Sequence, residues 1–182
     1  MEASLADHEP AVRRLCVATA VLNWPEASAA AGVPGPLSLI QRSSGFYRLY
    51  LMTVPAEGIE LAFAAPGLDE VSLVTDLITA MREAVGADAQ LRRPVLAGFH
   101  VGITKVVGEG FGGSGADRTL ALVRDPAVLG AAGHGETRAR LGVTITAALF
   151  EDLRAEGLSG TGWQRISSAG AWLKLFDPAP VS

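Results

Sequence analysis

The order of apolar and polar residues predicts strands and helices mixed along the whole chain. Residues 13–24, RRLCVATAVLNW, are a near-continuous apolar run rich in β-branched residues, which is typical of a central strand covered on both faces. Residues 46–54 and 59–65 are further apolar runs, and the four residues between them, 55–58, suit a hairpin turn. Residues 36–44, between the first apolar run and the second, suit one short helix.

An amphipathic helix is predicted over residues 68–86, where apolar residues recur at spacings of three and four. These residues are Val71, Val74, Leu77, Ile78, Met81 and Val85, and Gly86 is expected to end the helix as a cap. A strand follows over 94–107, then a glycine-rich turn over 108–115 and a helix from about 117 to 129. Residues 142–146 form a short strand that leads into a helix to about 156, and a closing hairpin has strands near 163–167 and 171–176.

This mixture of elements predicts an α+β fold, with helices packed on a mostly antiparallel sheet. A chain of 182 residues is short enough for a single domain, which we place at residues 13–178. Residues 1–12 are expected to be a flexible lead-in.

Composition narrows the classes of function. Hydrophobic residues make up 49% and charged residues 19%, which is enough apolar material for a core. The net charge of −4 and the lack of a Lys/Arg-rich run argue against nucleic-acid binding, because phosphate neutralisation needs a basic surface. No apolar segment approaches the ~20 residues of a membrane span, and the acidic N-terminus lacks a signal core. We therefore expect a cytoplasmic protein without a membrane partner. Cys16, the single cysteine, lies in an apolar run and is expected to be a buried thiol.

The glycine-rich turn leaves two interpretations open. Its glycines, at 108, 110, 112, 113 and 115, precede a helix, and helix N-termini bind phosphate groups. Their spacing matches neither the P-loop nor the dinucleotide fingerprint, and the P-loop lysine is missing. The turn is therefore either a phosphate contact or a flexible connection. His100, in the strand before it, has no second His, Cys or carboxylate at metal-ligand spacing and is expected to be a hydrogen-bonded core or cleft histidine.

Residues 98–126, GFHVGITKVVGEGFGGSGADRTLALVRDP, resemble the core of class III nucleotidyl cyclase catalytic domains. Gly98, His100 and Gly102 match that family's R-hydrophobic-G-hydrophobic-H-x-G-x-V strand, and Gly115 with the helix over 117–123 matches the family's glycine-containing turn and next helix. Residues 142–153 and 163–177 are similar to later segments of the family, so the resemblance covers about residues 13–177. It implies a nucleotidyl-cyclase-like fold with a ferredoxin-like βαββαβ core.

The resemblance also implies which positions would carry catalysis. The family holds two divalent metals on two aspartates, one in the first strand and one in the hairpin turn. Here residues 15–22 contain no carboxylate, and the turn offers only Glu57. On the helix after the glycine-rich turn, Asp117 stands at the family's asparagine position and Ala121 at its arginine position, with Arg118 and Arg124 three residues to either side of Ala121.

The candidate site residues come from this alignment. Asp117 and Arg118 are the catalytic candidates, and no metal ligand is assigned. The candidates for nucleotide binding are Glu57, Gly112, Gly113, Gly115 and Asp117.

Three functions remain open on the sequence. The favoured one is a catalytically impaired, cyclase-like signalling module without a cofactor, which binds a protein partner or small ligand; the resemblance implies a homodimer, because cyclases build their sites between two subunits. The alternative is an active, atypical class III cyclase that uses Mg or Mn to make a cyclic nucleotide from ATP or GTP, with substitute groups from Glu57, Asp117, Arg118 and Arg124. The third is an unrelated α+β ligand-binding or interaction domain whose glycine-rich turn is only a loop.

Overall fold

A computed structural model of the chain describes residues 11–22, 34–44, 49–54, 57–87, 93–107, 110–133 and 141–177. The expected lead-in lies almost entirely outside these residues. The elements in chain order are β1 (Val12–Val21), α2 (Pro36–Ser44), β2 (Leu49–Val54), β3 (Ile59–Ala64), α3 (Glu70–Ala87), β4 (Val95–Val107), β5 (Gly110–Gly112), α4 (Ser114–Arg124), α5 (Pro126–Gly133), β6 (Leu141–Thr146), α6 (Ala147–Ala155), β7 (Gln164–Ile166) and β8 (Ala171–Phe176).

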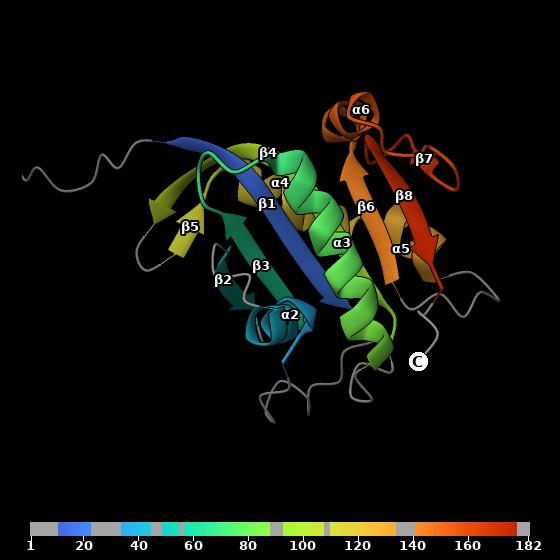
Figure 1. Cartoon of the computed structure of the whole chain (residues 1–182), viewed down its shortest axis with the longest axis horizontal. Coiled ribbons are helices and arrows are strands. Elements are labelled where there is room, and N and C mark those ends of the chain that lie inside the picture. The colour runs from blue at the N-terminus through green and yellow to red at the C-terminus, as the bar shows by residue number, and fades with distance from the viewer. Residues whose placement is uncertain are drawn as a thin grey trace, which may run out of the picture.

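The strands form one sheet in the order β2-β3-β1-β4-β6-β8-β7, and β5 pairs with the C-terminal end of β4 (Figure 1). Every neighbouring pair is antiparallel except β4 with β6, which are parallel. The expected α+β fold with a mostly antiparallel sheet is confirmed. β1 lies in the interior of the sheet, between β3 and β4, as its continuous apolar run predicts.

Helices cover both faces of the sheet. α2 and α3 lie on one face, and α4 and α5 lie on the other (Figure 1). β1 supplies alternate residues to the two cores, with Leu15 and Val17 on the α3 side and Cys16 and Ala18 on the α4 side, because successive strand residues point to opposite faces. Cys16 is fully buried, as expected.

Glycines bring α4 unusually close to the sheet. A Cβ on Gly102 of β4 would lie 2.6 Å from the Cα of Gly115 in α4. A Cβ on Gly98 would lie 3.0 Å from Cγ1 of Val123, farther along the same helix. The backbone of α4 therefore rests almost directly on β4, and the two glycines of the strand motif have a packing role.

The helix expected over 117–129 is two helices, which corrects the sequence prediction. α4 begins at Ser114 and ends at Arg124, because Pro126 disfavours a helical conformation at the residue before it. Asp125 is accordingly extended, with φ −65° and ψ 123°. Its Oδ1 accepts hydrogen bonds from the N–H groups of Ala127 and Val128 at 2.8 and 3.1 Å, and so caps the new helix α5.

Other boundaries differ in smaller ways. The glycine-rich turn contains a short strand, β5, which forms a hairpin with β4. Gly86 lies inside α3, which continues to Ala87, so its expected role as a cap is wrong. β1 ends at Val21 instead of running to residue 24, and the second strand begins at Leu49, with residues 46–48 outside the described part of the chain.

Candidate functional site

A buried carboxylate lies beside the central strand. Glu60 belongs to β3, pairs across the sheet with Thr19 of β1, and is only 4% exposed. It is the only buried carboxylate among the residues that the structure describes. An isolated buried charge is costly, so the partners of this carboxylate determine what it can do.

Those partners are the free donors at the start of α2. The N–H groups of Gly35, Leu37 and Ser38 donate to the carboxylate at 3.2, 2.7 and 3.2 Å. The hydroxyls of Ser38 and Thr19 also donate to it, the latter at 3.4 Å. The first N–H groups of a helix have no partner within the helix. Glu60, which belongs to β3, accepts hydrogen bonds from these groups and so caps α2.

Two neighbours of the capped turn fit this arrangement. Pro36, the first residue of α2, has no N–H, so the carboxylate reaches every N–H that residues 35–38 possess. A Cβ added to Gly35 would overlap the carboxylate of Glu60. Glycine at position 35 therefore lets the acid approach the backbone directly.

Glu57, the acidic residue that the sequence points to, lies on the surface. Its Oε2 accepts from Nη2 and Nε of Arg124 at 2.7 and 3.1 Å, and the two side chains are 48% and 46% exposed. The hairpin turn before β3 is thereby tied to the end of α4. The structure thus brings together two residues that the alternative cyclase hypothesis names.

Asp117 and Arg118, the catalytic candidates, are not joined to that pair by any contact that the structure describes. Asp117 is exposed in the first turn of α4, and its N–H donates to the carbonyl of Gly113 at 3.0 Å. Arg118 donates from Nη2 to the carbonyl oxygen of Ala169 at 2.5 Å. Arg118 therefore links α4 to the turn between β7 and β8.

The candidate glycines each have a structural reason. Gly113 precedes α4 with φ 108°, a conformation that L side chains rarely adopt. Gly115 is buried, and a Cβ there would lie 3.0 Å from Sγ of Cys16. Gly112 lies in β5, where a Cβ would meet only the side chain of Val107, at 3.2 Å.

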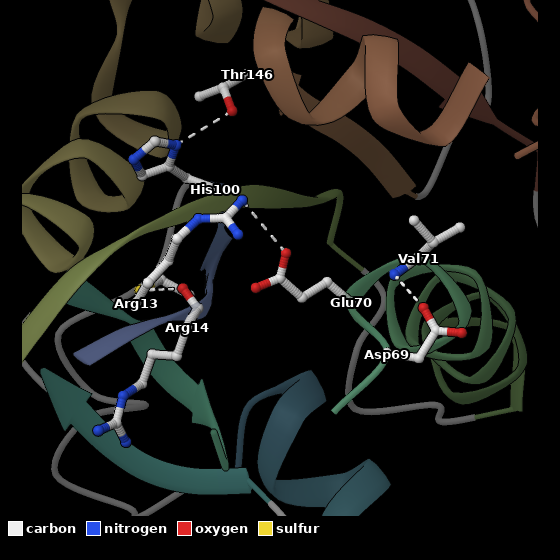
Figure 2. A network of polar contacts seen from close by, with 8 residues as sticks. Arg13, Arg14, Asp69, Glu70, Val71, His100 and Thr146 are labelled. Carbon is white, nitrogen blue, oxygen red and sulfur yellow. Dashed lines mark hydrogen bonds and ion pairs between the residues drawn. The ribbon is translucent and has the colours of Figure 1, made fainter. Parts of the chain in front are cut away.

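His100 connects β4 to β6. Its Nδ1 lies 3.1 Å from the hydroxyl oxygen of Thr146, the residue before α6 (Figure 2). Partial burial, followed by the positive charges of Arg118 and Arg13, lowers the pKa of His100 below its usual range. The imidazole is therefore neutral near pH 7. This agrees with the expected hydrogen-bonded histidine.

Arg14 is a buried cation that the sequence analysis did not single out. It is 7% exposed, and its guanidinium carbon lies 4.6 Å from the centroid of the Phe111 ring in β5. Its Nε has no hydrogen-bond partner among the described residues. The stacking of a cation on an aromatic face helps to fix the β4–β5 hairpin over β1. By contrast, the neighbouring Arg13 points elsewhere and pairs with Glu70 at 3.6 Å (Figure 2).

Two further properties limit the chemistry of the described residues. Burial raises the pKa of the Cys16 thiol to about 12, so the thiol is protonated and unreactive at neutral pH. No three His, Cys, Asp or Glu residues lie together to hold a metal ion in this part of the chain.

No helix among the described residues is long and apolar enough to cross a membrane.

Comparison with known proteins gives a likeness of fold. Neither a protein-family model nor a curated protein sequence matches the chain. The structure is similar to a crystal structure described as an adenylate/guanylate cyclase/hydrolase from Silicibacter pomeroyi, with a TM-score of 0.50 and 13% identity. The match covers 92% of this chain and 99% of that one. At such identity the likeness concerns the fold alone: the chain has a cyclase-like α+β fold.

Proposed function

We propose that the chain is a nucleotidyl-cyclase-like regulatory module that forms no cyclic nucleotide and acts in signalling by binding a protein partner or a small ligand. One observation carries the proposal: Glu60, the buried carboxylate beside β1, is fully engaged in capping α2. A metal-dependent cyclisation needs carboxylate oxygens that are free to bind cations.

The hydrogen bonds of Glu60 leave its carboxylate oxygens no free lone pair for a metal ion. An ionised carboxylate offers about four lone-pair positions. Here five donor groups point at its two oxygens, three of them backbone N–H groups and two of them hydroxyls. A metal ion could bind only by displacing these donors and leaving the first turn of α2 without partners, which is costly in a buried site.

The cationic side of the site supports the same conclusion. Position 121, where the resemblance implies an arginine, is an exposed alanine. Arg118 is held by the carbonyl of Ala169, and Arg124 is paired with Glu57. Removal of one transition-state donor from an enzyme costs about 10²–10³ in rate. A chain without the arginine and the metal carboxylates would therefore be left with little catalysis.

We propose that the module dimerises through the β4–β5 hairpin and the neighbouring edge strand β2. The exposed large apolar residues in the described part of the chain gather on these elements; they are Tyr50 at 53%, Ile103 at 47%, Val106 at 42% and Val107 at 55%. Tyr50 contacts Phe111 of the hairpin, with ring centroids 5.3 Å apart. Exposed apolar side chains that gather in one region are typical of protein interfaces.

Calorimetric titration of the purified protein with ATP and with GTP, each with Mn²⁺, tests the proposal when cyclic product is assayed in the same samples. We expect no cyclic product. Heat of binding without product would identify a nucleotide as the small ligand, and no heat would direct the search to protein partners. Formation of cyclic product would overturn the proposal.

The pairing of Glu57 with Arg124 favours a second candidate, an active and atypical class III cyclase. In it the surface acid would bind Mg or Mn, and the arginine would stabilise phosphate charge. The matched variants Glu57→Gln and Arg124→Gln separate the two candidates. If product forms, both variants must lose it; product that survives both substitutions would exclude these residues from catalysis.

A further inference from the structure

We infer that the N-terminus of α2 is an oxyanion cradle that the chain fills with its own Glu60, so that phosphate-bearing ligands are excluded from it. The inference deepens the proposed function, on which it rests, because it gives a physical reason why a nucleotide phosphate does not bind at this end of β1. It concerns an internal contact that keeps a binding site closed.

The donors around Glu60 are the kind that hold phosphate in proteins. Backbone N–H groups at a helix start, with nearby hydroxyls, bind oxyanions through short, charge-assisted hydrogen bonds. Here the N–H groups of Gly35, Leu37 and Ser38 converge on one carboxylate at 2.7–3.2 Å. The hydroxyls of Thr19 and Ser38 complete the set from two different elements.

The charge of Glu60 is balanced by dipoles alone. No lysine or arginine among the described residues forms an ion pair with it, whereas Glu57 and Glu70 both have arginine partners. The residue is nonetheless only 4% exposed. A buried anion without a cation is stable only where oriented N–H groups and the positive end of a helix replace the cation. The site is therefore built to favour a negative charge.

Gly35 shows that the cradle is shaped to its occupant. A Cβ at this position would overlap the carboxylate carbon and Oε2 of Glu60. The missing side chain leaves a space that the carboxyl group fills. Removal of the Glu60 side chain would thus leave donors and space together, about the size of a small oxyanion.

A tethered carboxylate competes strongly with a free anion. Glu60 is fixed on β3, which pairs with both β1 and β2, so its effective concentration at the cradle is far above that of a ligand in solution. An external phosphate would also have to leave the displaced carboxylate buried without partners. The natural chain is therefore closed to phosphate at this point, and the variant Glu60→Ala is open.

Thermal unfolding in inorganic phosphate tests the inference, with sodium chloride of equal ionic strength as the reference. We expect phosphate to raise the Tm of Glu60→Ala by about 2–4 °C above chloride, because an anion that binds only the folded state stabilises it. The natural chain and Glu151→Ala, which removes an exposed carboxylate of α6, should show no such difference. Equal phosphate effects on all three proteins, or none on Glu60→Ala, would overturn the inference.

The test remains decisive if Glu60→Ala does not fold in chloride. Its refolding yield is then compared in phosphate and in chloride, and phosphate must restore folded protein. A yield that phosphate leaves unchanged also overturns the inference. These outcomes are separate from the cyclase assay on the natural chain: cyclic product there would overturn the proposed function, whereas the phosphate response of Glu60→Ala decides only whether the cradle exists.

Discussion

Thr19 of β1 and Glu60 of β3 are directly opposed across the sheet, and the hydroxyl of Thr19 donates to the carboxylate at 3.4 Å. The pair lies on the face of the sheet that α2 and α3 cover. Through it, one acid ties two strands and the start of a helix together. Loss of the Glu60 carboxylate should therefore lower the stability of the fold.

The variant Glu60→Gln should lower the free energy of unfolding by about 1–3 kcal/mol. Glutamine has nearly the same shape, but its NH₂ group would face the N–H donors of Gly35, Leu37 and Ser38 instead of accepting from them. Urea unfolding followed by circular dichroism measures the difference.

Glu151→Gln is the matched control, because the same substitution is made at an exposed position of α6. Exposed substitutions of this kind usually change stability by less than about 0.5 kcal/mol. If the two variants were equally stable, the bonds around Glu60 would contribute nothing net to the fold.

The contact between Glu60 and the start of α2 could be predicted only in part from the sequence. The apolar runs correctly placed β1, β3, α3 and most of β4, because burial on one or both faces leaves a clear periodicity. Glu60 was missed: a single charged residue in the apolar run IELAFA was visible, and a helix over residues 36–44 was predicted, but the contact between them was not. Its donor Ser38 lies 22 residues away, and Thr19 lies 41 residues away. Periodicity records how deeply a residue is buried and carries no information on such remote partners.

The glycines of the 98–115 region show a different limit. Their resemblance to the cyclase strand and turn predicted a fold that the structure has. The pattern alone did not separate glycines that bind a ligand from glycines that permit close packing. The contact of Gly102 with Gly115 is visible only once α4 is placed on β4.

The break between α4 and α5, by contrast, could have been predicted from the local sequence. Pro126 lies inside the helix that was predicted from about residue 117 to 129, and Asp125 before it is a preferred capping residue. The proline and the capping aspartate set the boundary between the two helices, and the prediction of one continuous helix overlooked them.

Gly102→Ala should destabilise the protein by about 1–3 kcal/mol, as an added methyl group in a packed interior does. Its Cβ would lie 2.6 Å from the Cα of Gly115 and 2.8 Å from Nε2 of His100, so the backbone of α4 must move. Thermal or urea unfolding measures this cost.

Gly112→Ala provides the comparison within the same motif. Its Cβ would meet only the side chain of Val107 at 3.2 Å, and a side chain can adjust, so the cost should stay below about 1 kcal/mol. A larger cost for Gly112→Ala than for Gly102→Ala would contradict the close packing of α4 on β4.

Cys16 should not react with a thiol reagent such as DTNB at pH 8 while the protein is folded. Burial excludes the reagent and raises the pKa of the thiol to about 12, so almost no thiolate is present. In denaturing urea the same reagent should detect one thiol per chain, because Cys16 is the single cysteine. Rapid labelling of the folded protein would show that β1 is more open than the structure has it.

His100 should make the protein less stable in mild acid. Its pKa in the folded state is lowered by burial and then by Arg118 and Arg13, whereas in the unfolded chain it is about 6.5. Below that value the unfolded chain binds the proton more readily, so the free energy of unfolding falls as the pH drops from about 6.5 toward the lower, folded pKa.

Urea unfolding at pH 7.5 and 5.5 of the natural chain and of His100→Gln isolates this contribution. Other groups titrate equally in both proteins, so the natural chain should lose more stability between the two pH values than the variant does. Glutamine retains an amide that can bond to Thr146, the partner of Nδ1 at 3.1 Å, which keeps the link between β4 and β6. Equal losses in the two proteins would mean that His100 has the same pKa in the folded and unfolded chains. Neither burial nor the positive charges of Arg118 and Arg13 would then lower the pKa of the imidazole.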